Sequence, residues 1–335
     1  MSTLTIEHVS PQAGVRGGSV QVYGTGIDPH ALPDCRLVFG ASTTRPVVAT
    51  PTFLLGMIPE ATVSHTIQIV QNGRANNTVP FTAAALLAEN LHPVGSPAVD
   101  ARGAIYTTIS GTKGQQVPAS VFRVTAVGDA EPFVSGIVNP TGLAFGPDGD
   151  LYVSSRHEGT LYRVDAQGTV APFADGLGIA TGLAFDTQGR LYVGDRRGTV
   201  HQVAATGEAR VFARLGPSVA SYHLAFDDAE RLYVSYPTLS GSDQVYCIDA
   251  DGEIHTVARE LGRAQSLAFD LEHNLYVVAY IEGKGGVVKV TPAGDVEHVI
   301  SGMNLVGLAF GTHGELILAD NSALYTLDLG IPGRL

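Results

Sequence analysis

The stretch at residues 139–176, "NPTGLAFGPDGDLYVSSRHEGTLYRVDAQGTVAPFADG", decides the fold. It holds four short runs rich in β-branched and aromatic residues, separated by polar turns such as "GPDGD" and "DAQG". Runs this short that alternate with period two indicate strands rather than helices. The apolar phrase beginning at residue 142 returns at 182, 223, 266 and 307 as "GLAF", "HLAF", "SLAF" and "GLAF". Four strands recurring every ~40–45 residues predict the blades of a β-propeller.

A sixth, weaker copy of the phrase stands at residue 96, where "SPAV" precedes "DARGAIYTT". The last copy ends at "ALYTLDL" without a fourth strand, whereas "AALLAENLHPVGSPAV" before the first copy aligns on "VAPFADGLGIATGLAF". We therefore expect residues 83–88 to be the outer strand of the last blade, because this pairing hides the open edges of the ring. The sequence predicts a six-bladed propeller over residues 83–335, closed by a strand that precedes its first blade.

This part of the chain resembles the NHL-repeat propellers and the six-bladed gluconolactonase, or senescence-marker, superfamily. The phrase "P-x-G-L-A-F-x-x-x-G-x-L-Y-V" carries the resemblance, which covers about three quarters of the chain. It implies the propeller fold and leaves the function open, because this scaffold hosts lactonases, lyases, synthases and binding proteins.

Residues 1–82 do not follow this repeat. They contain short segments of alternating apolar and polar residues between Gly and Pro turns, as in "VSPQAGVRGGSVQVYGTGI". This pattern predicts a small antiparallel β-sandwich. Together with "VFG" at 38–40 and "NG" at 72–73, it resembles an IPT/TIG immunoglobulin-like domain. The resemblance implies a spacer or an interaction module for a protein partner. The all-β chain is thus expected to consist of a sandwich followed by the propeller, joined by a packed junction.

The composition excludes several classes of partner. The 335 residues carry a formal net charge of −12, which disfavours binding to nucleic acid. No apolar run is long enough to span a bilayer, and the beginning of the sequence has no features of a signal peptide. We therefore expect a protein that does not bind membranes and is cytoplasmic, or extracytoplasmic if a leader peptide has been removed. Two cysteines in different segments do not indicate a disulfide framework.

The candidate functional residues are those at which the repeat changes. In a propeller, the start of each inner strand and the loop after each second strand lie at one end of the central channel, where ligands usually bind. Inner strands begin with Thr-Gly in two copies, but with Tyr222-His223 in the fourth and Gln265-Ser266 in the fifth. The loops after the second strands add seven polar candidates, namely Arg156, His157, Asp195, Arg196, Tyr236, Tyr280 and Asp320.

Tyr222 and His223 are the candidate catalytic residues. We expect the Tyr222 ring to stack on a sugar-like ligand and His223 to exchange a proton near neutral pH. Arg156, His157, Asp195 and Arg196 are expected to form the neighbouring wall of the pocket. A buried structural histidine at residue 223, and turn-capping or ion-paired roles for Asp195, Asp320 and the arginines, remain as alternatives.

The lactonase resemblance implies a divalent cation, often calcium, held by a Glu in a "G-E-S-P" phrase. This chain has "VGSPAV", so Gly95 occupies that position, and none of the corresponding residues in the other copies is a carboxylate. We therefore expect no tightly held calcium. A zinc site formed by His92, His157 and His223 is the weaker alternative.

Two functions remain open at this point. One is a binding protein for a small polar or carbohydrate-like ligand, or for a partner, at the mouth of the channel. The other is a hydrolase or lyase of the gluconolactonase kind with an altered site.

Overall fold

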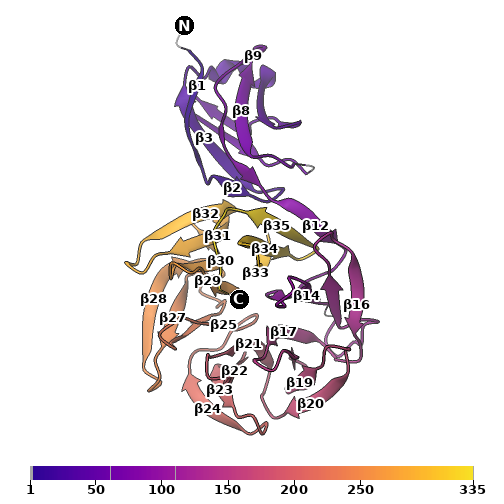
Figure 1. The fold of residues 1–335 in the computed structure, drawn as a ribbon. Helices are drawn as coiled ribbons and strands as arrows, with labels where there is room; N and C mark the ends of the chain where they lie inside the picture. The colour runs from indigo at the N-terminus through magenta and orange to yellow at the C-terminus, as the bar shows by residue number, and fades with distance from the viewer. Residues whose placement is uncertain (1–2, 61, 110, 335) are drawn as a thin grey trace.

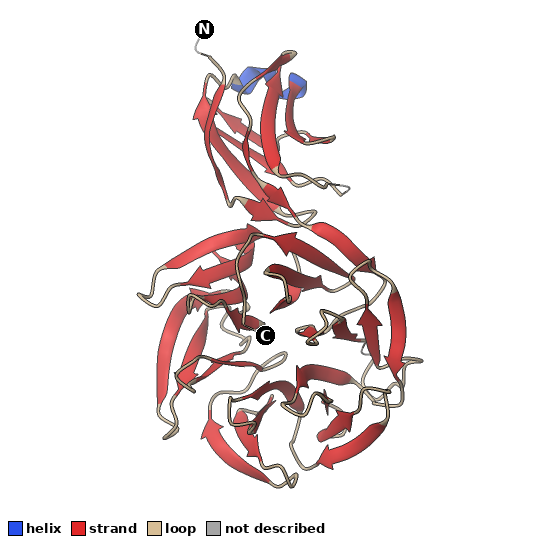
Figure 2. Ribbon diagram, viewed as in Figure 1, coloured by secondary structure: helices blue, strands red, loops and turns tan. Residues whose placement is uncertain are grey.

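The computed structural model describes residues 3–60, 62–109 and 111–334. Their regular structure is almost entirely β-strand, and the short helix η1 (Pro29–Asp34) is the exception (Figure 2). Within these ranges no helix is long and apolar enough to cross a membrane. The predicted all-β class is confirmed.

The N-terminal part forms two antiparallel sheets. One contains, in spatial order, β1 (Thr5–Ser10), β3 (Ser19–Thr25), β7 (Phe53–Met57) and β6 (Val48–Thr50). The other contains β10 (Val79–Pro80), β8 (Thr66–Gln71), β4 (Cys35–Phe39) and β5 (Ser42–Thr44), with β9 (Arg74–Ala75) paired to β8. Alternate residues of both sheets, such as Val22, Leu37 and Ile69, share one buried core. Period-two alternation is what places them on the inner faces.

The remaining chain forms sheets arranged in a ring around a central axis (Figure 1). We number them by the chain order of their inner strands. The first is β13 (Ala98–Val99), β14 (Ile105–Thr108), β15 (Val121–Val124) and β16 (Ala130–Val134); the second is β17 (Pro140–Phe145), β18 (Leu151–Ser155), β19 (Thr160–Val164) and β20 (Val170–Ala174). The third is β21 (Ala180–Phe185), β22 (Leu191–Asp195), β23 (Thr199–Val203) and β24 (Ala209–Arg214).

The fourth sheet is β25 (His223–Phe226), β26 (Leu232–Ser235), β27 (Asp243–Ile248) and β28 (Ile254–Leu261). The fifth contains β29 (Leu267–Phe269), β30 (Leu275–Ile281), β31 (Lys284–Val290) and β32 (Val296–Ser301). The sixth contains β33 (Leu305–Phe310), β34 (Glu315–Asp320), β35 (Ala323–Asp328) and β12 (Ala85–Glu89). This arrangement is that of a β-propeller.

The repeated Phe and Tyr of the sequence phrase hold neighbouring sheets together. The ring of Tyr152 on β18 meets Phe173 of its own sheet and Phe185 of the next, edge to face, at centroid distances of 5.1 and 5.0 Å. Tyr192 repeats this arrangement with Phe212 and Phe226. Aromatic pairs at this distance and angle are favourable beyond the area that they bury. The repeat therefore encodes the contact between sheets as well as the strands themselves.

The turns between first and second strands repeat just as closely. One carboxylate oxygen of Asp186 accepts hydrogen bonds from the backbone N–H groups of Gln188 and Arg190, at 3.0 and 2.8 Å. Asp227 and Asp270 bond the equivalent N–H groups of their own turns. Each buried carboxylate thus satisfies donors that the turn leaves unpaired. We call this end of the ring the turn end, and the opposite end, where the inner strands begin, the loop end.

The ring closes as the sequence predicts. Strand β12 pairs antiparallel with β35, with Ala85 opposite Thr326 and Glu89 opposite Ala323. The pairing occupies residues 85–89, slightly later than the expected 83–88. A segment that precedes the first sheet therefore completes the sixth.

The junction between the two parts is a continuous sheet. Strand β2 (Ala13–Gly14) lies between β32 and β11 (Thr82–Ala83) and pairs parallel with both. Nearby, Arg16 donates a hydrogen bond to the Tyr325 hydroxyl at 2.8 Å and forms an ion pair with Glu89 at 2.7 Å. The expected packed junction is confirmed, although no pattern in the sequence indicated that a strand from the first part would extend the fifth sheet.

Candidate functional site

A cavity of about 490 Å³ runs along the central axis. Its walls are the inner strands of the ring, together with Arg334: residues 95–99, 141–147, 182–187, 221–226, 267–269 and 308–310. Leu and Phe side chains line its depth, whereas Ser96, Thr141, Ser221 and His223 bring polar groups to its loop end. A concave site that combines apolar walls with a few convergent polar groups is typical of small-molecule binding.

The C-terminal segment covers the turn end of this cavity. The backbone N–H of Arg334 donates to Phe269 O at 2.9 Å, and Leu271 N–H donates to Pro332 O at 2.9 Å. The Arg334 guanidinium forms an ion pair with Asp228. The C-terminus accordingly lies at the centre of the ring in Figure 1. The segment that contains Arg334 therefore forms part of the wall at the turn end.

His223 lies in the wall of the cavity at the first residue of β25. The residue is only 6% exposed, and its imidazole makes no hydrogen bond to any described residue. Burial lowers the pKa of His223 from 6.5 to about 4, because the charged form is poorly solvated there. The ring is thus a neutral hydrogen-bonding group at physiological pH, with its polar atoms unpaired within the described residues.

The neighbouring inner strands have no room for such a side chain. A Cβ at Gly182 would overlap the carbonyl oxygen of Tyr222, and one at Gly142 would overlap that of Thr181. The other departures from glycine, Ser96 and Ser266, are already engaged, since their hydroxyls hydrogen-bond to each other at 2.7 Å and Ser266 also accepts from Leu308 N–H at 2.9 Å. His223 is therefore a change in the repeat that leaves a polar side chain available.

Tyr222 requires a correction. It is fully buried, and its ring stacks on Tyr236 at a centroid distance of 4.5 Å with an interplanar angle of 2°. Its hydroxyl donates to Gly216 O at 2.5 Å, and burial raises its pKa far above the usual value. The expectation that Tyr222 offers a free face to a ligand is wrong, because that face packs inside the fourth sheet. Tyr236 is likewise 5% exposed and belongs to the same aromatic stack.

The two acidic candidates, Asp195 and Asp320, stabilise turns of the fold and do not line the cavity. Asp195, 3% exposed, accepts from the N–H groups of Ile179 and Arg197 and pairs with the Arg197 side chain at 3.0 Å. Asp320 accepts from Ala323 N–H and from the Tyr325 hydroxyl, each at 2.7 Å. Their oxygens are occupied by backbone and side-chain donors, which is the turn-capping alternative.

Two other candidates also lie outside the cavity wall. Gln265 is buried and donates to Leu305 O at 3.3 Å, which links the fifth and sixth sheets. Tyr280, half-buried on β30, pairs through its backbone with Gly262.

The three histidines of the zinc alternative do not come together. His92 and His157 are exposed, whereas His223 is buried in the channel. Among the described residues, no group of three or more His, Cys, Asp or Glu side chains is placed to hold a metal ion. The predicted zinc set is therefore wrong for this structure.

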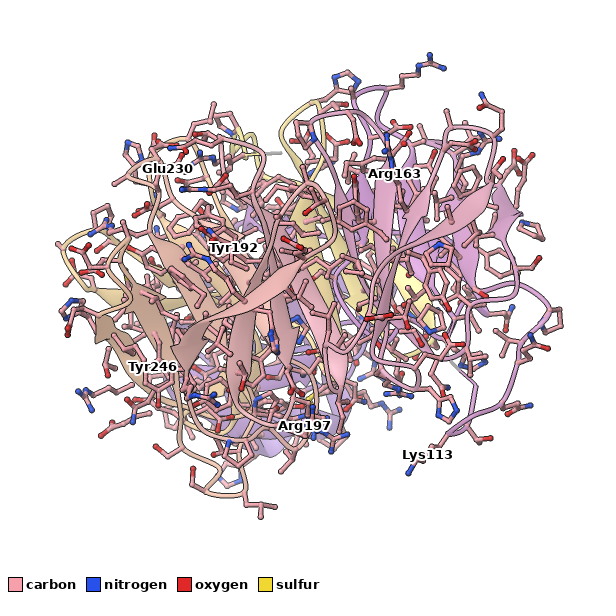
Figure 3. All side chains as sticks on the ribbon, turned by 90° about the horizontal axis from the view of Figure 1, so that it is seen from below. Lys113, Arg163, Tyr192, Arg197, Glu230 and Tyr246 are labelled. Carbon is pink, nitrogen blue, oxygen red and sulfur yellow. The ribbon has the colours of Figure 1, made fainter. Side chains whose placement is uncertain are left out.

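Arg156 and Arg196 lie at the loop end of the second and third sheets. Each follows the second strand of its sheet and is half-buried. The Arg196 guanidinium donates to Ser218 O at 3.1 Å and Val219 O at 2.7 Å. Figure 3 shows Arg197, the next residue, and Lys113 at one face of the ring, opposite Glu230 and Arg163. Neither Arg156 nor Arg196 is among the residues that line the cavity.

Sequence reasoning missed three contributors. Ser221 lies in the cavity wall beside Tyr222. Arg334 belongs to a segment that has no counterpart in the repeat, so no periodic signal pointed to it. Asn139 orders the long loop after β14, because its amide accepts from Gly114 N–H at 2.7 Å and donates to Thr112 O at 3.0 Å. Its position before Pro140 at the start of an inner strand was the available signal.

The chain is similar in fold to several solved structures. A protein provisionally named a gluconolactonase aligns with a TM-score of 0.61 and 19% identity over 75% of this chain and 93% of its own. An auxiliary nutrient binding protein from Bacteroides ovatus aligns with a TM-score of 0.56 and 13% identity over 97% and 98% of the two chains. A streptogramin B lyase aligns with a TM-score of 0.52 and 12% identity over 97% and 92%. No protein-family model and no curated protein sequence matches the chain. These likenesses establish the propeller fold and leave the function open between binding and catalysis.

Proposed function

We propose that the protein binds a small polar ligand in the central channel, which the ligand reaches from the loop end. The observation that carries this proposal is His223, a buried imidazole that faces the cavity and has no partner within the described residues. A neutral imidazole has one N–H donor and one nitrogen acceptor, so the His223 side chain can form hydrogen bonds with a ligand in the cavity. The cavity volume of about 490 Å³ lies in the range typical of sites for small molecules.

The architecture assigns supporting roles to the rest of the chain. We infer a six-bladed propeller from residue 83 onward and an immunoglobulin-like domain of the IPT/TIG kind before it, at residues 1–82. The parallel pairing of β2 with β32 and the Arg16–Glu89 ion pair support a spacer that is rigidly attached. Such a spacer leaves the outer sheet face of the domain for a protein partner.

A panel of neutral sugars, sugar acids, lactones and amino acids, tested by thermal shift and then by calorimetry, examines this proposal. We expect at least one compound to bind saturably and His223→Ala to weaken its binding at least tenfold. The matched control is His92→Ala, which removes an exposed histidine outside the cavity and is expected to bind as the wild type does. Binding that is unaffected by His223→Ala contradicts the proposal.

The hydrolase or lyase alternative is favoured by one observation, the position of the His223 imidazole in the cavity wall. A neutral imidazole there can accept a proton from a bound substrate, but its pKa of about 4 makes it a weak base near neutral pH. Turnover of a lactone by the wild type that disappears in His223→Ala supports catalysis. Binding of the same compounds without turnover supports the binding protein.

A further inference from the structure

The charged side chains in the wall of the central cavity are already paired. Among the described wall residues, Asp186 and Arg334 are the ones ionised at neutral pH, since burial lowers the pKa of His223 and keeps its imidazole uncharged. The buried Asp186 carboxylate pairs with Arg190 and accepts two backbone N–H groups of its own turn. The Arg334 guanidinium pairs with Asp228. An ionised ligand therefore finds no unpaired opposite charge in the described wall.

The wall is better suited to an uncharged ligand. An ion that enters the cavity gives up water without gaining a counter-charge, which costs free energy. Each inner strand lies at the end of its sheet and pairs with a neighbouring strand on one side only. Backbone groups along the free edge of such a strand can bond to water or to an uncharged polar molecule.

Two uncharged side chains of the wall keep their hydrogen-bonding groups available. Ser221 and His223 stand on either side of Tyr222, both line the cavity, and they are 8% and 6% exposed. Neither side chain forms a hydrogen bond with a described residue. By contrast, the Thr141 hydroxyl donates to a backbone carbonyl at 3.2 Å, and the Ser96 hydroxyl bonds to a serine at the start of the fifth sheet at 2.7 Å.

The residue between these two side chains is held firmly. The backbone N–H of Tyr222 donates to the Thr181 hydroxyl at 3.0 Å, and its carbonyl accepts from Gly182 N–H at 3.0 Å. The Tyr222 ring is fixed in turn by its stacking on Tyr236. The two side chains that flank Tyr222 therefore project from an anchored backbone, which reduces the entropy lost when a ligand bonds to both.

A serine hydroxyl and a neutral imidazole can each donate and accept a hydrogen bond. Ligand hydroxyl groups also do both, whereas a carboxylate only accepts and an ammonium group only donates. We infer that the channel selects an uncharged ligand and that Ser221 and His223 together bind its hydroxyl groups. This inference rests on the proposed function. It makes Ser221 a second ligand-binding residue, and the apolar Leu and Phe side chains of the wall contact the C–H groups of the ligand.

The test compares probes that are similar in size and differ in charge. D-Glucuronamide carries an uncharged amide where D-glucuronate has a carboxylate, and D-glucose carries a hydroxyl where D-glucosamine has an ammonium group. Binding to the full chain is measured by calorimetry at neutral pH and constant ionic strength. We expect the wild type to bind at least one uncharged probe saturably and its charged counterpart at least tenfold more weakly.

The variant Ser221→Ala tests the serine. It is expected to weaken binding of that uncharged probe about fivefold or more, because one hydrogen bond to the ligand is lost. The melting temperature of the ligand-free variant should equal that of the wild type, since the hydroxyl has no partner among the described residues. Ser242→Ala is the matched control, because it removes an exposed serine of the same sheet outside the cavity, and it keeps wild-type affinity.

Three results overturn the inference. One is a charged probe that binds as tightly as its uncharged counterpart, or more tightly. Another is a Ser221→Ala variant that binds as the wild type does, or that loses binding only as its melting temperature falls. The third is a wild type that binds none of the four probes. The proposed function is decided separately, because any compound of the wider panel whose binding depends on His223 leaves it in place.

Discussion

The two ends of the propeller use the same repeat differently. At the turn end, Asp186, Asp227 and Asp270 make the same two backbone hydrogen bonds in three successive sheets. At the loop end, the equivalent inner-strand position is glycine in the second and third sheets and His223 in the fourth. The carboxylates of the repeated aspartates are occupied by backbone N–H groups, whereas the His223 imidazole forms no hydrogen bond with a described residue and can bond to a ligand. The repeated aspartates therefore stabilise the ring, whereas His223 is placed to bind a ligand.

The largest effect is expected where the inner strands are tightest. Gly182→Ala places a methyl group against the carbonyl of Tyr222, so the third and fourth sheets must separate. We expect a loss of about 3 kcal/mol or more in the free energy of unfolding, measured by urea denaturation. Gly95→Ala is the matched control, because its nearest neighbour, Thr141 O, lies at 3.1 Å and the loss should be clearly smaller. Equal losses would show that the loop end is not crowded at the third sheet.

The pH dependence of stability sharpens the comparison at His223. The pKa of His223 is about 4 in the folded protein and near 6.5 when unfolded, so the unfolded chain binds the proton more tightly. Stability is therefore expected to fall as the pH drops from 6.5 to 4, by roughly 2–3 kcal/mol from this group. The difference between the wild type and His223→Gln, measured across this range, isolates the contribution. A constant difference would mean that the imidazole titrates normally and is well solvated.

A smaller effect is expected at the turn end. Asp227→Ala removes the acceptor for the N–H groups of Ala229 and Arg231 and should cost about 2 kcal/mol without changing ligand binding. Asp251, an exposed carboxylate with no side-chain bond to a described residue, is the control, and its replacement by alanine should be nearly neutral. Loss of binding in Asp227→Ala at unchanged stability would break the division between the two ends.

The smallest effect concerns a change in the repeat that is not at the loop end. Thr107 stands where the next two sheets have Val153 and Val193, and its buried hydroxyl has no hydrogen-bond partner in the part of the chain that the structure describes. Thr107→Val should raise the free energy of unfolding by about 1 kcal/mol, because it removes an unsatisfied polar group. Calorimetric unfolding measures this gain. A loss would indicate that the hydroxyl contributes to the structure through water.

The fold was predictable because its determinants are local and periodic. The recurring "GLAF" and "LYV" phrases supply both the strands and the Tyr–Phe contacts between sheets, as in Tyr152 with Phe185. The closing strand was predictable from its alignment with the fourth strand of another copy. Strand β2 was not, because a two-residue strand that pairs with a distant sheet leaves no pattern in its own sequence.

The site was predictable only in part, because burial and partners decide what a polar residue can do. Tyr222 and His223 are adjacent in the chain, yet the Tyr222 ring packs against Tyr236, whereas the His223 imidazole lies in the cavity wall and bonds to no described residue. Asp195 and Arg196 are adjacent as well, but the carboxylate is occupied by Arg197 while the guanidinium points to the loop before His223. Such differences depend on the neighbouring sheet, which sequence spacing does not reveal.

The most direct test of the account is a paired measurement on His223→Ala. Its melting temperature and its affinity for the tightest-binding compound of the panel are compared with those of the wild type. The account predicts a melting temperature within a few degrees of the wild type and an affinity at least tenfold weaker. A large fall in melting temperature, with binding lost only in proportion to unfolding, would contradict it and identify His223 as a structural residue.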